Sequence, residues 1–335
     1  MFIKLYEQII NYIKKEYKFL ITLMMIFVLF TFKLPYYIDI PGGIINISDR
    51  ISINDSNGLS GTMNFAYVSE LRATIPTLII EKINNDWDLI DYKDVVANNE
   101  TEEEAYLRDT ILLKEAVSNA LYVGFSKSNT DFKLKNNKVF VTGIYKYANT
   151  DLKVGDQIIK IDDTIINNYE DLSFVRNKKV GDTVSITVLK NNKEYVRYAK
   201  LIDLENQVLI GVTISNTFDI DSNNVVDINY KAKESGPSGG LMMALTIYSY
   251  LSGDDLTNGR TIVGTGTIDK DGNVGSIGGV KYKLIGAVKN KADLFIVPNG
   301  ENYNEAIKIK EEKGYNIDIY GVDTFQDAID VLKKN

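Results

Sequence analysis

The chain has 335 residues, a formal net charge of −7, and neither histidine nor cysteine. The two missing residue types exclude disulfides, thiolate nucleophiles, Ser-His-Asp triads, and zinc or iron sites with the usual ligands. No EF-hand-like loop for Ca²⁺ occurs either, so we expect neither a metal nor a cofactor. The acidic balance argues against nucleic acid as a partner.

The first distinct segment is an apolar run from Phe19 to Phe32, bounded by Lys18 and Lys33. It is short for a membrane span, which takes about 20 residues, but the two lysines can snorkel to the interface. The alternatives are a buried core helix or a cleaved signal peptide, although no small-residue cleavage site follows the run. We therefore expect residues 1–40 to be a cytoplasmic N-terminus with a transmembrane helix.

The distribution of basic residues predicts the orientation of this helix. Lys4, Lys14, Lys15 and Lys18 precede the apolar run, whereas Lys33 and Arg50 alone follow it closely. By the positive-inside rule the N-terminus lies in the cytoplasm. The sequence therefore predicts a single-pass protein of the cell membrane with its catalytic domain extracellular.

The sequence predicts that residues 41–126 form an extracytoplasmic α/β linker region. Strands are expected at 44–53 and 61–68, and a helix at 76–83 with proline in its first turn. Thr101-Glu102-Glu103-Glu104 is a capping-box sequence that opens a long helical pattern.

From about residue 127 to 204 the pattern changes to short strands, at 138–141 and 157–161 and in a hairpin of 182–189 with 194–201. The segments Leu152–Asp162 and Val180–Val184 resemble a PDZ domain. The resemblance implies a groove that binds a peptide by β-augmentation. A spacer with a degenerate groove is the alternative.

Residues 205–335 alternate strands and helices, as in an α/β domain, so the whole chain is of the α+β multidomain class. The expected strands are 208–214, 225–230, 261–268, 294–297 and 317–320. The expected helices are 239–251, 280–289, 303–312 and 325–332, with a short one at 171–176 in the preceding domain.

The candidate nucleophile is Ser238, in the glycine-rich segment Glu234–Gly240 before an apolar helix. Glycines admit a substrate backbone, and a helix N-terminus offers N–H groups to a developing oxyanion. Gly236-x-Ser238-x-Gly240 also fits a nucleophile elbow, but without histidine the base must be another residue type. Lysine is the best remaining candidate.

Several segments of this region resemble the proteolytic domain of the Lon family of serine–lysine proteases. They are Gly236–Gly240, Thr265–Ile268, Gly272–Leu284 and Ala292–Pro298. The resemblance makes Ser238 the nucleophile and Lys281 the general base. It makes Thr265 the hydrogen-bond partner of that lysine, with Gly236, Pro237 and Gly239 supporting the nucleophile. The order of anchor, PDZ and proteolytic domain resembles the membrane-anchored Lon-like proteases of Gram-positive bacteria.

A lysine can act as a base near neutral pH only if its pKa falls from about 10.4. Burial beside Val280 and Leu284, and a place in the first turn of a helix, would both lower the pKa of Lys281. Lys283 is the competitor, but it lies two positions along the helix and so points to a different face.

Two family features are absent from these residues. Lon proteases often have an acidic residue directly before Gly-Pro-Ser, whereas Ser235 stands there and Glu234 is one position earlier. No Gly-x-x-x-x-Gly-Lys-Ser/Thr motif occurs, so we expect cleavage without ATP.

The sequence therefore predicts a membrane-anchored, ATP-independent serine endopeptidase that cleaves exported peptides or membrane-proximal protein segments through a Ser-Lys dyad. Its expected partners are a peptide or protein substrate, a PDZ-bound peptide, the membrane, and further copies of itself in a homo-oligomer. The alternative is a non-catalytic PDZ scaffold whose Lon-like domain only binds or assembles.

Overall fold

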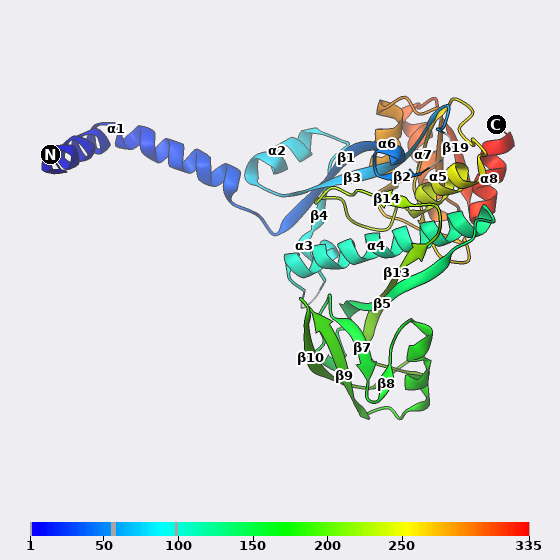
Figure 1. The fold of residues 1–335 in the computed structure, drawn as a ribbon. Helices are drawn as coiled ribbons and strands as arrows, with labels where there is room; N and C mark the ends of the chain where they lie inside the picture. The colour runs from blue at the N-terminus through cyan, green and yellow to red at the C-terminus, as the bar shows by residue number, and fades with distance from the viewer. Residues whose placement is uncertain (1, 55–57, 98–99, 335) are drawn as a thin grey trace. The chain divides into compact units, whose positions relative to one another are not determined.

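A computed structural model describes residues 2–54, 58–97 and 100–334 and divides the chain into two compact units (Figure 1). The smaller unit comprises Met1–Pro41 and Ser69–Val95, and the larger comprises Gly42–Val68 and Val96–Asn335. Two strands, β1 (Tyr36–Asn46) and β3 (Thr62–Arg72), run from one unit into the other.

The smaller unit contains α1 (Phe2–Thr31), α2 (Ile75–Ile83), β4 (Asp88–Asp91) and α3 (Tyr92–Val95). Strand β4 pairs antiparallel with β1. The guanidinium of Arg72 lies 4.9 Å from the ring centroid of Tyr37 and 4.5 Å from that of Tyr92. These cation–π contacts stabilise the packing around β1, because the side chains come from three different elements.

Within the described ranges, no helix is long and apolar enough to cross a membrane. This corrects the expectation of a transmembrane helix in residues 1–40. The segment is indeed helical, but the apolar run occupies only the second half of α1. Lys14, Lys15, Glu16 and Lys18 occupy the middle of the same helix, which leaves fewer than the ~20 apolar residues that a span takes.

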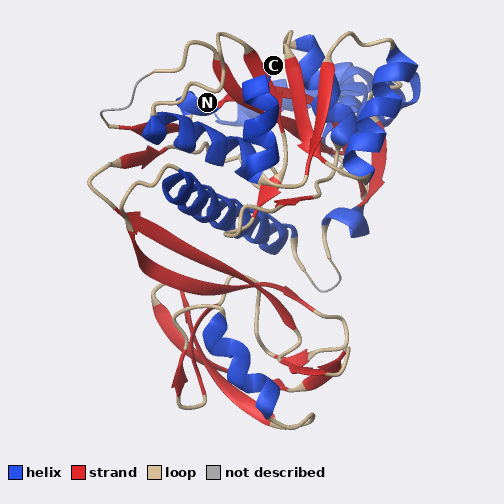
Figure 2. Ribbon diagram, turned by 90° about the vertical axis from the view of Figure 1, so that its right-hand side faces the viewer, coloured by secondary structure: helices blue, strands red, loops and turns tan. Residues whose placement is uncertain are grey.

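The larger unit is built on parallel strands in the order β19 (Asp318–Val322), β18 (Leu294–Pro298), β15 (Thr261–Gly264) and β3. Helices flank both faces of this sheet (Figure 2). On one face Ile262 and Ile296 join a core with α5 (Gly240–Ser252) and α8 (Phe325–Lys334). On the other face Val263 and Phe295 join a core with α6 (Val280–Lys289) and α7 (Glu301–Lys313). Neighbouring residues of one strand thus serve opposite layers, which explains the continuous apolar strand sequences.

The PDZ-like region has its own sheet, in the order β13-β5-β7-β9-β10-β6, and its own core. The strands of this sheet are β5 (Lys133–Ile144), β6 (Asn149–Thr150), β7 (Gln157–Ile161), β8 (Thr164–Ile165, paired with β7), β9 (Thr183–Lys190), β10 (Lys193–Lys200) and β13 (Val212–Asp221). Strands β11 (Ile202–Leu204) and β12 (Gln207–Leu209) pair with each other in a separate hairpin. The expected hairpin is confirmed as β9 paired with β10. The expected short helix is the 3-10 helix η2 (Glu170–Asn177).

Helix α4 (Glu102–Lys127) packs against both α5 and β13 of the PDZ-like sheet (Figures 1 and 2). Its capping box is confirmed, because the side chains of Thr101 and Glu104 accept hydrogen bonds from each other's backbone N–H. The Ser118 hydroxyl donates to the Phe218 carbonyl at 2.7 Å and accepts from the Phe218 N–H at 3.0 Å. These buried bonds fix β13 to the helix.

Short elements complete the larger unit. They are η1 (Ile47–Asp49), β2 (Ile51–Ile53), β14 (Val226–Ile228), β16 (Thr267–Ile268) and β17 (Val274–Gly275). Strand β14 pairs with β2, so the segment that leads to Ser238 is held against residues 51–53, which come much earlier in the chain. The expected helices and strands from residue 225 onward thus occur close to their predicted positions. The expected strand at 208–214 is instead divided into β12 and β13, and β13 belongs to the PDZ-like sheet.

Candidate active site

Ser238 lies in the loop that leads into α5, two residues before the helix begins. Gly236 has a φ of +85°, a conformation that glycine adopts without strain, and its N–H donates to the carbonyl of Asp109 on α4 at 3.0 Å. The N–H of Gly240 donates to the Pro237 carbonyl at 3.1 Å. The loop is therefore fixed on both sides of Ser238, which stands half-buried at the positive end of the helix dipole.

A small pocket of about 50 Å³ opens beside Ser238, lined among others by Phe65, Leu113, Tyr230 and Met243. Gly239 also lines this pocket, where a Cβ would stand in ordinary van der Waals contact, 3.4 Å from Phe65 Cγ. The pocket places apolar surface next to the hydroxyl, as a site for a substrate side chain does.

Thr265 joins the serine loop to a lysine. Its hydroxyl donates to the Ser238 carbonyl at 3.0 Å and accepts a hydrogen bond from Lys283 Nζ at 3.3 Å. Its own N–H donates to the carbonyl of Ile296 at 2.9 Å, which fixes Thr265 at the carboxyl end of β15. Ser238 and Lys283 are thereby connected through one fully buried hydroxyl.

Lys283 is only 4% exposed, which is unusual for a lysine. Burial disfavours the ammonium and lowers the pKa of Lys283 to about 8. A substantial fraction of this side chain is therefore neutral at mildly alkaline pH, as a general base must be.

The lysine expected beside Thr265 was Lys281, and the structure corrects that expectation. Positions two apart on a helix differ by about 200° in direction, so only one of the two lysines can face Thr265. Lys283 takes this inward position, whereas Lys281 is half-buried with its Nζ 5.5 Å from the ring centroid of Tyr282. Burial, the criterion applied to Lys281 in the sequence, therefore favours Lys283, the lysine that was set aside.

An ion pair that the sequence analysis missed holds the segment before Ser238. The guanidinium of Arg50 donates from Nε to both carboxylate oxygens of Glu234, at 3.0 and 2.9 Å, and from Nη2 to Oε1 at 2.7 Å. Arg50 is 8% exposed. The Glu234 carboxylate also accepts from the Lys231 N–H at 3.2 Å. Glu234 is thereby a loop anchor, a role that its place before Gly-Pro-Ser had left open.

Both members of this pair are held in their charged forms. The hydrogen bond to Glu234 raises the pKa of Arg50 above its usual value. Burial by itself would raise the pKa of Glu234, but the hydrogen bonds from Arg50 and the Lys231 backbone outweigh it and lower that pKa. No spacing pattern could reveal the pair, because 184 positions separate the two residues.

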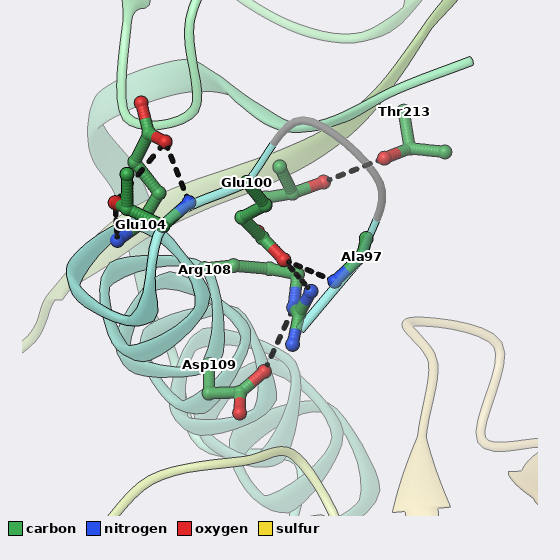
Figure 3. Close-up of polar contacts among 8 residues, drawn as sticks. Ala97, Glu100, Glu104, Arg108, Asp109 and Thr213 are labelled. Atoms are coloured by element: carbon green, nitrogen blue, oxygen red, sulfur yellow. Dashed lines mark hydrogen bonds and ion pairs between the residues drawn. The ribbon is translucent and has the colours of Figure 1, made fainter. Parts of the chain in front are cut away.

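A second set of polar contacts fixes the part of α4 that holds Gly236 (Figure 3). Arg108 donates from Nη1 to the Glu100 carboxylate and from Nε to Asp109 Oδ1 at 3.0 Å. Glu100 also accepts from the Ala97 N–H at 3.1 Å. The contacts fix the start of the helix, whose Asp109 carbonyl receives the Gly236 N–H.

In the part of the chain that the structure describes, no group of three acidic residues could hold a metal ion. The arrangement at Ser238 offers instead a hydroxyl, a buried amine with a lowered pKa, and backbone N–H groups at a helix N-terminus. These groups are sufficient for nucleophilic catalysis with a lysine base.

Comparison with known families locates two domains. Residues 225–334 match the C-terminal proteolytic domain of Lon proteases (S16), and residues 127–196 match the PDZ domain. The chain is 37% identical over 98 residues to a Lon protease of Campylobacter jejuni, which covers 29% of this chain and 12% of that protein. It is 23% identical over 355 residues to Lon protease 2 of Borreliella burgdorferi, covering 89% of this chain and 43% of that protein. The matched part is therefore less than half of either relative.

Among solved structures, the chain is similar to the PDZ domain of an SdrC-like protein from Listeria monocytogenes. The two are 27% identical, the match covers 24% of this chain and 92% of that one, and the TM-score is 0.22. The match to the Lon proteolytic domain, together with the relatives named Lon protease, supports the interpretation that the chain is a serine peptidase.

Proposed function

We propose that this chain, which carries a PDZ domain and a Lon-type proteolytic domain, is a serine endopeptidase with Ser238 as nucleophile and Lys283 as general base. The observation that carries the proposal is the contact of the buried Lys283 amine with Thr265, whose hydroxyl also binds the Ser238 carbonyl. No histidine exists in the chain to take the proton instead. Lys281 is not retained as the base.

In the proposed reaction Ser238 Oγ attacks the scissile carbonyl while the neutral Lys283 amine accepts the hydroxyl proton. Backbone N–H groups of the serine loop before α5 stabilise the oxyanion that forms, because those of Gly240 and Leu241 already donate to the Pro237 and Gly266 carbonyls. The lysine ammonium returns the proton to the leaving amine as the peptide bond breaks. Water then attacks the acyl-enzyme with Lys283 again as the base, and this releases the new carboxylate and restores Ser238.

We propose that the substrate is a flexible peptide or an unfolded protein segment, cleaved without ATP by these residues. The pocket beside Ser238 holds about 50 Å³, which suits a side chain of an extended segment. Exported peptides and membrane-proximal segments are the substrates proposed from the sequence.

The test is cleavage of a library of fluorogenic peptides by the full chain, compared with Ser238→Ala and Lys283→Met. We expect cleavage by the unchanged chain and its loss in both variants, together with covalent labelling of Ser238 by a serine-directed fluorophosphonate. Cleavage that persists in Ser238→Ala would overturn the proposal. No cleavage and no labelling in any condition would favour the scaffold alternative.

The PDZ domain supplies a second proposed site, for a peptide. A pocket of about 360 Å³ lies between η2 and the segment β12–β13, lined by Leu172, Val175, Ile210, Val212 and Ile214 among others. Strand β13 ends the sheet order and pairs with β5 along one edge. Asn216 and Phe218 of this strand already donate their N–H groups to Glu115 and Ser118 on α4. A peptide added along the Val212–Ile214 part of its other edge would gain backbone hydrogen bonds and an apolar pocket, which is the mode of β-augmentation.

We propose, finally, that the second half of α1 attaches the chain to a membrane. Large apolar side chains of this stretch are exposed on the helix, including Phe19, Met24, Phe27 and Phe30. Exposed apolar surface of this extent marks a site of contact with lipid or protein. Recovery of the chain in the membrane fraction, and its release on removal of residues 2–31, would support attachment. The homo-oligomer stays a prediction that light scattering in detergent can test.

A further inference from the structure

A second and larger groove adjoins the Ser238 pocket. It has a volume of about 490 Å³ and lies between α4, the strands β5 and β13, and the segment from Ile228 to Glu234. We call it the α4 groove. Leu113, Tyr230 and Glu234 line both the α4 groove and the Ser238 pocket, so the two hollows are neighbours with shared walls.

The lining of the α4 groove includes many apolar side chains. The volume falls within the range of about 300–1,000 Å³ typical of ligand sites. Most of the lining side chains come from elements fixed by the buried Ser118–Phe218 hydrogen bonds, so the groove is formed before a ligand arrives. Its apolar lining residues include Leu113, Val117, Leu121, Phe140, Phe218 and Ile228.

The rim of the α4 groove is basic, although the chain as a whole is acidic. Lys114, Lys138 and Lys231 line it and are all exposed. The two acidic side chains of the lining are already engaged, because Asp219 accepts a hydrogen bond from Asn136 at 2.7 Å and Glu234 binds Arg50. Arg50 neutralises Glu234, whereas Asp219 keeps its negative charge, so the three lysines still leave the lining of the groove with a net positive charge.

We propose that the α4 groove binds the part of the substrate on one side of the scissile bond and selects segments in which an apolar side chain is flanked by acidic residues. The inference rests on the proposed function, since Ser238 must be the point of cleavage. It is supported by the walls that the two hollows share and by the complementary charge of the rim. An extended segment places alternate side chains on opposite sides, so apolar and acidic positions can face floor and rim in turn.

The experiment uses three amidated, fluorescein-labelled peptides with a central Phe-Leu pair flanked by Asp, Ser or Lys. Binding is measured by fluorescence anisotropy on the full-length Ser238→Ala chain, and cleavage is measured on the unchanged chain. The test variant combines Lys114→Glu with Lys138→Glu. The matched control is Lys127→Glu, an exposed lysine on the same helix that does not line the groove. Circular dichroism checks that each variant is folded.

We expect the Asp-flanked peptide to bind best and to lose about tenfold in affinity in the double variant, or roughly 1.4 kcal/mol. The Lys-flanked peptide should gain affinity there, and Lys127→Glu should change neither. The inference would be overturned if the double variant and the unchanged chain discriminated equally among the three peptides. Ser238-dependent cleavage in the same experiment would still support the proposed function. A charge-dependent change of binding without any Ser238-dependent cleavage would instead overturn the proposed function and leave the groove as a peptide-binding site.

Discussion

The catalytic region and the PDZ region present their polar groups in opposite ways. Around Ser238 the important groups are buried and already bonded, as Thr265 and Lys283 show. In the PDZ region the strand β13 ends the described sheet, and its outer side faces a pocket of about 360 Å³. Catalysis takes groups held in one position, whereas ligand capture takes groups left available. Substitutions in the catalytic region should therefore abolish peptide cleavage, whereas substitutions in the PDZ region should reduce it only in part.

The sharpest test of the comparison is Lys283→Met beside Lys281→Met. Loss of the base should lower kcat/KM by about a thousandfold or more, because serine is a weak nucleophile without a base. Lys281→Met should change it less than about threefold, as a change away from the chemistry does. The readout is peptide cleavage at pH 8, and a larger loss in Lys281→Met would restore the assignment made from the sequence.

The same variant separates activity from stability. At pH 7 the folded chain holds a buried ammonium at Lys283 whose pKa is lowered to about 8, and this costs free energy of folding. Methionine removes that cost and loses one hydrogen bond to Thr265, so Lys283→Met should be more stable by about 1 kcal/mol. A higher Tm together with lost cleavage is the expected result, and a collapsed Tm would mean that the lost activity reports unfolding.

The ion pair of Arg50 and Glu234 should matter next. Arg50→Ala leaves the half-buried Glu234 carboxylate without its charged partner and releases the segment before Ser238. We expect kcat to fall by about 30-fold through loss of positioning, with the midpoint of the pH profile unchanged because Lys283 is untouched. Lys233→Ala, an exposed neighbour of Glu234, is the control. A shifted pH midpoint in Arg50→Ala would argue that the pair acts on the base itself.

The pH dependence follows from the lowered pKa of Lys283. Below a pKa of about 8 the amine is protonated and cannot accept the serine proton, and above it the amine is neutral. The value of kcat should therefore rise roughly tenfold from pH 7 to pH 9, with a midpoint near the lysine pKa. Measured on a substrate without titratable groups, a flat profile would argue against Lys283 as the base.

The sequence sufficed for most of the fold because its patterns are local. The capping box at Thr101, the apolar strand at 294–298 and the glycine-bounded helix after Gly279 all form where their residues indicate. The site was only partly accessible, because which of two nearby lysines faces Thr265 depends on packing between α6 and β15. Arg50 and Glu234 meet through the pairing of β2 with β14, a contact that no local pattern encodes. The prediction of a transmembrane helix was wrong for a simpler reason, because charged residues in the middle of α1 confine the apolar run to its second half.

The smallest effect is expected in the PDZ pocket. Ile214→Lys puts a charge on the pocket wall of β13, where a bound peptide would bury apolar surface. Long substrates that reach both regions should lose several-fold in kcat/KM, about what a weakened tether costs, whereas short peptides should be cleaved as before. Thr213→Lys is the matched control, because Thr213 is exposed on the same strand and does not line the pocket. An equal loss for short and long substrates would mean that β13 transmits the disturbance to α4 through Ser118, and the two regions would then act as one.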